Sequence, residues 1–229
     1  MKLSVIIPTL NEGARIGNLV EYLFMHRDER LQEVIVVDGG STDDPVAQAE
    51  LKGAIVKKIM KSSRAIQMNE GVSWASGDVL YFVHADTLPP SCYIEDIENS
   101  IKEGFQFGCY QSRFDQPNWR MRMNAFFTRF NFIMCRGGDQ SLFVMTDFFK
   151  KTKGYDESMQ IMEEYEWLQR AQKTGKLKIM SNSCLISTRK YDKNSYFRVN
   201  LINFVVFMMF FAGVSQDKMV ETYKKYLRS

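Results

Sequence analysis

Short β-branched runs alternate with segments of helical pattern over the first 90 residues of the chain. This alternation is typical of βαβ units, in which consecutive strands lie parallel. Runs such as SVIIP and VIVVD are apolar almost throughout, which predicts strands covered by helices on both faces. The fold class that follows is α/β, with a mostly parallel, Rossmann-like central sheet flanked by helices. Its strands are expected at residues 3–7, 33–37, 54–59 and 79–83.

Residues with strong capping preferences precede the predicted helices. Asp43 and Asp44 stand directly before Pro45, and Ser62 or Ser63 opens a helix that is expected to end near residue 75. After residue 86 the alternation becomes irregular. There we expect helices at 91–103 and 163–173, strands at 107–112, 141–145 and 177–186, and a helical tail over 195–227 that is broken near Gly213 and Ser215.

The composition excludes several classes of protein. With 45% hydrophobic and 25% charged residues, the chain is globular rather than disordered. A net charge of +3 does not indicate a nucleic-acid binder. The four cysteines form no C-x-x-C pair and are expected to be reduced core thiols. Residues 2–8 lack the features of a signal peptide, so we expect a cytoplasmic protein.

Polar residues follow three of the predicted strands at the point where each strand ends. They occupy residues 8–12, 38–43 and 84–87. In an open parallel sheet, ligands bind outside the carboxyl ends of the strands. The three clusters therefore predict one crevice at a single edge of the sheet.

Asp38 directly follows an apolar strand and is a candidate to accept hydrogen bonds from a base or a ribose. The alternative is that Asp38 only caps the next turn. Gly39 lets the backbone approach a ligand closely, and Thr9 and Glu12 supply further acceptors. For Glu12 a role at a helix start is the alternative.

Asp86 is the strongest candidate for a metal ligand. A hard divalent cation that bridges two phosphates needs carboxylate oxygen and usually only one or two protein ligands. His84 lies two residues earlier and is expected on the same side of the strand. This histidine either coordinates a softer Mn²⁺ or only shapes the site.

Three stretches resemble, in order and spacing, the nucleotide-binding half of family 2 glycosyltransferases: SVIIPTLNE, VIVVDGGSTDD and GDVLYFVHADT. The triplet His84-Ala85-Asp86 resembles a variant of that family's D-x-D metal motif. The resemblance covers residues 3–190. It is strongest to a bacterial subgroup associated with arsenosugar biosynthesis, through Arg64, Gln67, Asn69, Gly138-Asp139-Gln140 and Met162-Glu163-Glu164.

The resemblance implies a GT-A domain over residues 1–190 and a helical C-terminal extension over 191–229. Within the domain, residues 1–90 would bind the nucleotide and 91–190 would face the acceptor. The implied function is inverting, metal-dependent transfer of a sugar from a nucleotide-diphosphate sugar to an unidentified acceptor hydroxyl, with Mn²⁺ or Mg²⁺ as the cofactor. The implied donor-binding residues are Pro8, Thr9, Glu12, Asp38, Gly39, Arg64, Gln67, His84, Ala85 and Asp86, with Asp86 and His84 as the metal ligands.

Glu164 falls where the family keeps its catalytic base, which is usually the aspartate of a Glu-Asp pair. Because the glutamate side chain is longer, either the acceptor pocket is adjusted or Glu163 takes the role. Without the resemblance, an acidic first helical turn would explain both residues. Asp139 and Gln140 follow two glycines and are candidates to contact the sugar or the acceptor, with a turn cap as the alternative.

Residues 113–136 interleave arginines with aromatic residues, which is typical of an amphipathic surface element. Single-stranded nucleic acid would suit the same mixture, but no recognisable RNA-binding motif accompanies it, so no nucleic-acid partner is expected. Residues 204–214 carry no charge but fall short of the ~20 residues that span a bilayer. The C-terminal helices are left with three roles: core packing, a homodimer contact, or peripheral contact with the inner face of a membrane. The sequence does not identify the acceptor, and a lipid and a small molecule are the candidates.

Two other functions fit parts of the pattern. A non-catalytic nucleotide-sugar-binding protein on a GT-A scaffold is motivated by His84 and Glu164, which stand where the family prefers aspartate. A sugar nucleotidyltransferase shares the sheet and the metal chemistry, but its glycine-rich basic loop after the first strand is replaced here by residues 9–12. A dehydrogenase is disfavoured because no G-x-G-x-x-G follows that strand.

Overall fold

The computed structural model describes residues 1–60 and 63–227. Ser62, one of the two predicted helix starts, lies outside the described residues. Within them the strands form one eight-stranded sheet in the order β3-β2-β1-β4-β7-β6-β8-β5. The strands are β1 (Leu3–Thr9), β2 (Leu31–Asp38), β3 (Ile55–Lys58), β4 (Val79–Phe82), β5 (Thr87–Leu88), β6 (Phe107–Phe114), β7 (Leu142–Met145) and β8 (Leu177–Ile186).

The sheet is parallel through its first half and mixed beyond it. The pairs β3·β2, β2·β1 and β1·β4 are parallel, as is β6·β8. Strand β7 runs against both β4 and β6, and β5 runs against β8. The predicted mostly parallel α/β sheet is therefore confirmed, with β7 and β5 as the reversed strands.

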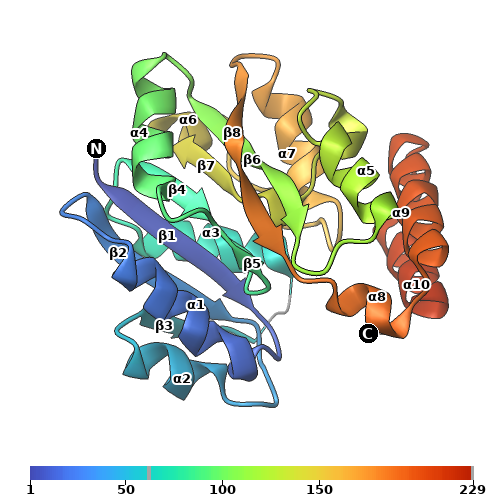
Figure 1. Ribbon diagram of the computed structural model, residues 1–229, viewed down its shortest axis with the longest axis horizontal. Helices are drawn as coiled ribbons and strands as arrows, with labels where there is room; N and C mark the ends of the chain where they lie inside the picture. Colours follow the sequence, from blue (N-terminus) through green and yellow to red (C-terminus); the bar gives the residue numbers. More distant parts are fainter. Residues whose placement is uncertain (61–62, 228–229) are drawn as a thin grey trace.

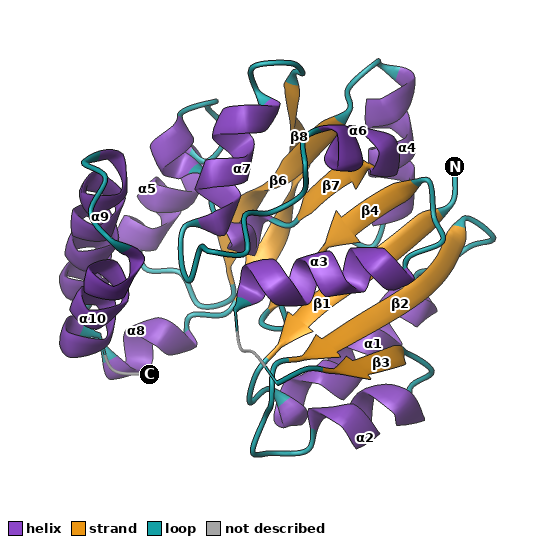
Figure 2. Ribbon diagram, turned by 180° about the vertical axis from the view of Figure 1, so that it is seen from behind, coloured by secondary structure: helices purple, strands orange, loops and turns teal. Residues whose placement is uncertain are grey.

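Helices cover both faces of the sheet (Figures 1 and 2). Alternation along β1 divides the core, because Val5 and Ile7 face one side and Ile6 faces the other. The Val5 side packs against α1 (Gly13–Met25), α2 (Pro45–Leu51) and α4 (Tyr93–Lys102). The Ile6 side packs against α3 (Arg64–Trp74), α6 (Thr146–Lys151) and α7 (Glu163–Ala171).

The predicted capping residues mark two helix starts. Asp44 is the N-cap of α2, and its side chain accepts a hydrogen bond from the Ala47 N–H at 3.3 Å. Ser63 is the N-cap residue of α3, although its hydroxyl donates to the Met159 carbonyl instead. Residues 177–186, expected to hold one or two strands, form the single strand β8.

The remaining helices lie together beyond the β6–β8 end of the sheet (Figure 1). They are α5 (Trp119–Phe127), α8 (Arg189–Lys193), α9 (Tyr196–Phe211) and α10 (Gln216–Tyr226), and short 3₁₀ turns occupy Ile133–Cys135 and Gly138–Gln140. The predicted break in the tail is confirmed, since Gly213 has a φ of +71° and Ser215 is the N-cap of α10. No helix within the described ranges is both long and apolar enough to cross a bilayer.

Gly71→Ala should destabilise the protein because α3 lies directly on β1 at this point. A Cβ at residue 71 would stand 2.4 Å from Ile6 Cγ2 and 3.3 Å from Val37 Cγ2, both in the core. Such overpacking costs about 1–3 kcal/mol and should lower the urea midpoint of unfolding without changing the slope. Ser73→Ala, at an exposed position of the same helix, is the matched control and should change the free energy of unfolding by less than about 0.5 kcal/mol. Equal effects of the two substitutions would contradict this account.

Candidate functional site

Asp38 lies at the predicted crevice, where β1 and β2 end side by side. It pairs in register with Thr9, and its side chain is 1% exposed. The carboxylate accepts hydrogen bonds from the Ser41 N–H at 3.1 Å and the Ser41 hydroxyl at 2.5 Å. The turn-capping contact therefore exists, and binding of a base or a ribose by Asp38 stays a prediction.

Two loops that follow β1 and β2 are joined by their polar side chains. The Asn11 N–H donates to the Ser41 hydroxyl at 2.8 Å, and Asn11 Oδ1 accepts from the Thr42 N–H at 2.8 Å. The Asp43 carboxylate accepts from the N–H of Gly13, the first residue of α1. The sequence marks these residues as polar clusters, but it carries no local signal for the contacts between the loops. Together the contacts give the crevice a defined wall.

Gln67 holds the ends of the two strands together. Its side chain is 2% exposed, and its amide nitrogen donates to the carbonyls of Thr9 and Val37, each at 2.8 Å. Gly39 makes room for it, since a Cβ there would lie 3.1 Å from the Gln67 amide carbon. Pro8 and Thr9 are the last two residues of β1, so the strand ends in this region. The structure gives Gln67 a supporting contact, and a contact with the nucleotide stays a prediction.

Glu12 is the N-cap residue of α1, but its side chain makes no capping bond. Its carboxylate instead forms a two-pronged ion pair with Arg189, with N–O distances of 2.6 and 3.2 Å, and a second pair with Arg15 at 3.3 Å. Arg189 stands far along the chain, at the start of α8, so no local pattern could have indicated it. The ion pair joins the C-terminal helices to the rim of the crevice.

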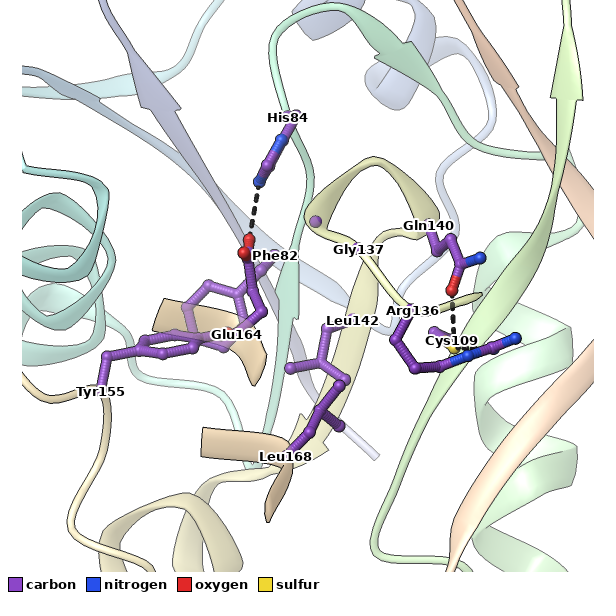
Figure 3. A pocket seen from close by; sticks show the side chains of 11 residues that line it. Phe82, His84, Cys109, Arg136, Gly137, Gln140, Leu142, Tyr155, Glu164 and Leu168 are labelled. Atoms are coloured by element: carbon purple, nitrogen blue, oxygen red, sulfur yellow. Dashed lines mark hydrogen bonds and ion pairs between the residues drawn. The ribbon is translucent and has the colours of Figure 1, made fainter. Parts of the chain in front are cut away.

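His84 and Glu164 form the central contact of a second group of predicted residues. The His84 Nε2 lies 3.1 Å from the Glu164 Oε1, and both side chains are largely buried. Gly138 permits this approach, because a Cβ there would stand 2.1 Å from the Glu164 oxygen and 2.2 Å from the His84 ring. Figure 3 shows the two side chains pointing toward each other from the end of β4 and from α7.

The charges of this pair stabilise each other. Burial lowers the pKa of His84, but the hydrogen bond and the charge of Glu164 outweigh burial and hold that pKa above its ordinary value. Burial raises the pKa of Glu164, but His84 and Arg64 outweigh it and hold that pKa below its ordinary value. The Glu164 carboxylate is therefore kept ionised by its neighbours.

Glu163 lies beside this pair in a different environment. Its side chain is 1% exposed, its oxygens accept no hydrogen bond from any described residue, and its nearest cation is Arg64 at 3.5 Å. Burial, together with the charge of Glu164, raises the pKa of Glu163 to about 7. Met162, the N-cap of α7, has a φ of +68°, a left-handed conformation that is uncommon outside glycine. Local strain therefore accompanies the two glutamates.

Asp86 follows the buried residue Ala85 at the end of β4 and is half-buried. Its carboxylate makes no hydrogen bond or ion pair with another described residue, and it acts electrostatically on His84 and Asp139. Over residues 1–60 and 63–227, no three His, Cys, Asp or Glu side chains converge as a cluster for a metal ion. A free, hard carboxylate at this position still fits a cation that takes its other ligands from a diphosphate and water. His84 fits such a cation less well because Glu164 occupies its Nε2.

Asp139 and Gln140 are neighbours in the turn Gly138–Gln140, but their side chains lie in different surroundings. Burial raises the pKa of Asp139, and the charges of His84, Asp86 and Glu164 also act on its carboxylate. Gln140 is 2% exposed and turns inward, where its amide nitrogen donates to the Cys135 carbonyl at 2.8 Å. Asp139 therefore borders the predicted site. Gln140 supports the turn, and its contact with a sugar or an acceptor stays a prediction.

A small pocket lies under the His84–Glu164 contact (Figure 3). On one side it is bounded by these two residues and Tyr155, and on the other Arg136 and Gln140 gather around Cys109. Its remaining walls are Phe82, Leu142, Leu168 and the Gly137-Gly138 backbone. The Glu164 carboxylate is thus set against mainly apolar walls.

The C-terminal helices supply residues that the sequence did not indicate. Lys190 of α8 donates to the hydroxyl of Tyr223 in α10 and lies 4.9 Å from the centre of its ring. Lys190 also acts electrostatically on Asp139, and Tyr223 acts on Arg64. Arg189, Lys190 and Tyr223 therefore place the extension at the rim of the site.

The sequence of the chain is similar to those of curated glycosyltransferases. A curated relative, glucosyl-3-phosphoglycerate synthase of Mycobacterium tuberculosis, is 31% identical over 96 residues, which cover 38% of this chain and 30% of the relative. Dolichol-phosphate mannosyltransferase of Pyrococcus furiosus is 34% identical over 113 residues, which cover 45% of this chain and 31% of that protein. The chain thus spans about a third of the length of these curated relatives.

Solved structures match over nearly the whole chain. TarS 1–349 of S. aureus in complex with UDP-GlcNAc superposes with a TM-score of 0.67 at 16% identity, covering 100% of this chain and 74% of that one. Glucosyl-3-phosphoglycerate synthase of M. tuberculosis in complex with Mn²⁺, UDP-glucose and phosphoglyceric acid gives a TM-score of 0.67 at 15% identity, covering 93% and 80%. These matches confirm the predicted GT-A fold.

The family follows from a sequence model that describes the majority of the chain. The model "Glycosyl transferase family 2" matches residues 4–175. This range contains all the predicted site residues, from Pro8 to Glu164. The chain belongs to glycosyl transferase family 2.

Proposed function

We propose that the protein is an inverting, metal-dependent glycosyltransferase that moves a sugar from a nucleotide-diphosphate sugar to an acceptor hydroxyl. The observation that carries the proposal is the Glu164 carboxylate, held by His84 at 3.1 Å, near the free carboxylate of Asp86. In this proposal one carboxylate would accept a proton and the other would meet a cation, at the edge of the sheet where parallel strands end and ligands bind.

The donor-binding part of the proposal rests on the crevice between β1 and β2. Asp38 and Thr9 lie where these strands end, and Gln67 fixes the spacing between them. The solved proteins of similar fold were bound to UDP-GlcNAc and UDP-glucose, which favours a uridine donor among the nucleotide sugars. Arg64, which is 56% exposed, is available to a phosphate.

The metal part of the proposal rests on Asp86. Similar structures were obtained with Mn²⁺ or Mg²⁺ together with UDP. Asp86 would hold such a cation by its free carboxylate, and Arg64 lies within electrostatic reach. A bound cation would offset negative charge on the departing diphosphate.

Glu164 is the proposed catalytic base and His84 its positioning residue. The ionised Glu164 carboxylate would take the proton from the acceptor hydroxyl as that oxygen attacks the anomeric carbon. Glu163 is less suited to this role, because its side chain is more deeply buried than that of Glu164 and no described residue hydrogen-bonds to its carboxylate to orient it. His84 and Glu164 each stand where the family prefers an aspartate, and these two residues are in direct contact with each other. His84 would therefore orient the base instead of ligating the metal.

Several finer assignments belong to the same proposal. Residues 1–90 would form the nucleotide-binding half, 91–190 the acceptor half and 191–229 a helical extension. Membership of the subgroup associated with arsenosugar biosynthesis, a cytoplasmic location, and contact of the extension with a membrane or a second copy all stay predictions. A non-catalytic nucleotide-sugar-binding protein is the second candidate, because a protein that has lost activity could also carry His84 and Glu164 in place of the aspartates that the family prefers.

Asp86→Ala should abolish metal-dependent binding of the donor. We expect one of the UDP-, GDP-, dTDP- or CDP-sugars to raise the melting temperature of the wild type with Mn²⁺ or Mg²⁺, because a ligand at about 100 times its Kd adds about 2.7 kcal/mol. That corresponds to several degrees for a chain of this size. Glu95→Ala, an exposed carboxylate on α4, is the control and should keep the shift. A shift of the same size in Asp86→Ala would exclude Asp86 as the ligand.

Glu164→Gln should reduce kcat for donor hydrolysis or transfer by about 10²–10⁴-fold with little change in the donor KM. His84→Ala should also lower kcat, while the metal concentration for half-maximal activity stays the same. The double variant should be no slower than Glu164→Gln alone, because both act through one carboxylate. His26→Ala removes the other histidine of the chain and serves as the control. A shifted metal dependence in His84→Ala would show that the histidine is a metal ligand, and wild-type activity that is undetectable would favour the binding-protein alternative.

Glu163→Gln should gain stability over the wild type as the pH rises from 5 to 8. The folded state raises the pKa of Glu163 to about 7, so the wild type loses stability as the pH rises from the ordinary carboxyl range through that value. The neutral glutamine avoids this loss, which amounts to about 1–3 kcal/mol. The measurement is the free energy of unfolding in urea at both pH values. Glu166→Gln removes a half-buried ion pair with Arg170 and should instead cost about 1 kcal/mol, equally at both pH values. A Glu163→Gln effect that is independent of pH would contradict the burial argument.

A further inference from the structure

Helix α9 presents an apolar stripe outward as well as inward. Its inward residues Val199, Ile202 and Val206 pack against α10. The outward stripe repeats at helical spacing through residues that are each about half exposed or more: Phe197, Leu201, Phe204, Met208 and Phe211. A helix that is apolar all round is normally covered on all sides, and the described residues leave this outward stripe of α9 exposed.

Helix α5 continues this stripe into a single surface, which we call the α5–α9 face. The Asn124 amide donates to Asn200 Oδ1 at 2.9 Å, and the Arg120 guanidinium lies 4.6 Å from the centre of the Phe197 ring. Trp119, at the start of α5, is 68% exposed. The two helices lie side by side in both views (Figures 1 and 2).

The charged residues on the two segments that carry the α5–α9 face are all basic. Residues 116–138 and 193–216 contain no aspartate or glutamate, although the whole chain has 27 acidic against 30 basic residues. Arg122, Arg129 and Arg198 are exposed on these segments. An apolar face whose segments carry exposed arginines and no acidic residue is complementary to a surface that is anionic at its headgroups and apolar beneath.

We propose that the α5–α9 face docks on an anionic membrane surface. A symmetric dimer through this face would bring the arginines of both copies into one interface, with no acidic residue on these segments to pair with them. Single-stranded nucleic acid would use the rings of this face but would gain nothing from Leu201 and Met208, whereas an apolar bilayer interior accepts aromatic and aliphatic side chains alike. Aromatic and aliphatic side chains together with arginine are instead the composition of helices that lie in the headgroup region.

The face is connected to the candidate site through the chain that follows α5. Residues 128–136 lead from the face to Arg136, whose carbonyl accepts a hydrogen bond from the Tyr165 hydroxyl of α7. Gly138 then contacts the His84–Glu164 pair. Docking would therefore set the acceptor half of the site beside the bilayer, a consequence that rests on the proposed function.

The test is co-sedimentation of the full chain with vesicles of phosphatidylcholine, with and without about one-third phosphatidylglycerol. We expect binding to the anionic vesicles only, weakened by salt. Each arginine near an anionic surface contributes about fivefold. Arg122→Glu with Arg198→Glu should therefore weaken binding by about 25-fold or more. Lys150→Glu with Lys173→Glu, at exposed positions elsewhere, is the charge control.

A second pair of variants tests the apolar stripe. Leu201→Ser with Met208→Ser should also weaken vesicle binding by about tenfold or more, since each removes exposed apolar area that would enter the bilayer. Leu51→Ser with Met25→Ser changes the same residue types at positions that are 77% and 71% exposed on α2 and α1, and should bind as the wild type does. Circular dichroism and melting temperature show whether each variant is folded.

Three results would overturn the proposal: no binding of the wild type to anionic vesicles, equal binding by the face variants and their controls, or a wild-type dimer that only the face variants dissociate. Tighter binding to single-stranded oligonucleotides than to vesicles would overturn it as well. The donor thermal shift is measured without vesicles, and the sedimentation without donor. Failure of the docking proposal and failure of the proposed function are therefore seen separately.

Discussion

The site depends on the close packing of α3 against β1. Gly71 lets the helix lie directly on Ile6 of β1. Gln67, one turn earlier, then reaches the carbonyls at the ends of β1 and β2, and Arg64 reaches Glu163 at the start of α7. Residues at this spacing share one helix face, so a single packing contact sets the position of all three side chains.

The same helix also fixes the segment that leads to the catalytic candidates. The Asn69 side chain donates to the Tyr155 carbonyl at 2.9 Å and accepts from the Tyr155 N–H at 3.1 Å. Tyr155 in turn lines the pocket beneath Glu164. The ends of β1 and β2 and the segment beside the proposed base are therefore positioned by one helix.

The fold was largely predictable from the sequence, because its signals are local. The apolar runs of β1 and β2, the Asp44-Pro45 start of α2 and the Gly213 break each depend on a few neighbouring residues. The site was predictable only in part. Asp38, His84 and Asp86 follow strands and could be placed at one edge, whereas the Glu12–Arg189 pair joins residues from opposite ends of the chain and has no local signal. The inward turn of Gln140 likewise depends on Cys109, a distant residue in the sequence that only packing brings near.

The position of β8 in the sheet bears on how the chain folds while it is being synthesised. β8 lies between β6 and β5, both of which precede it in the sequence. Until residues 177–186 leave the ribosome, which adds about 5–20 residues per second, one edge of β6 has no partner strand. An open edge of this kind can pair with a neighbouring nascent chain. The strand that completes the sheet is therefore also the one whose late arrival exposes the chain to aggregation and strand exchange.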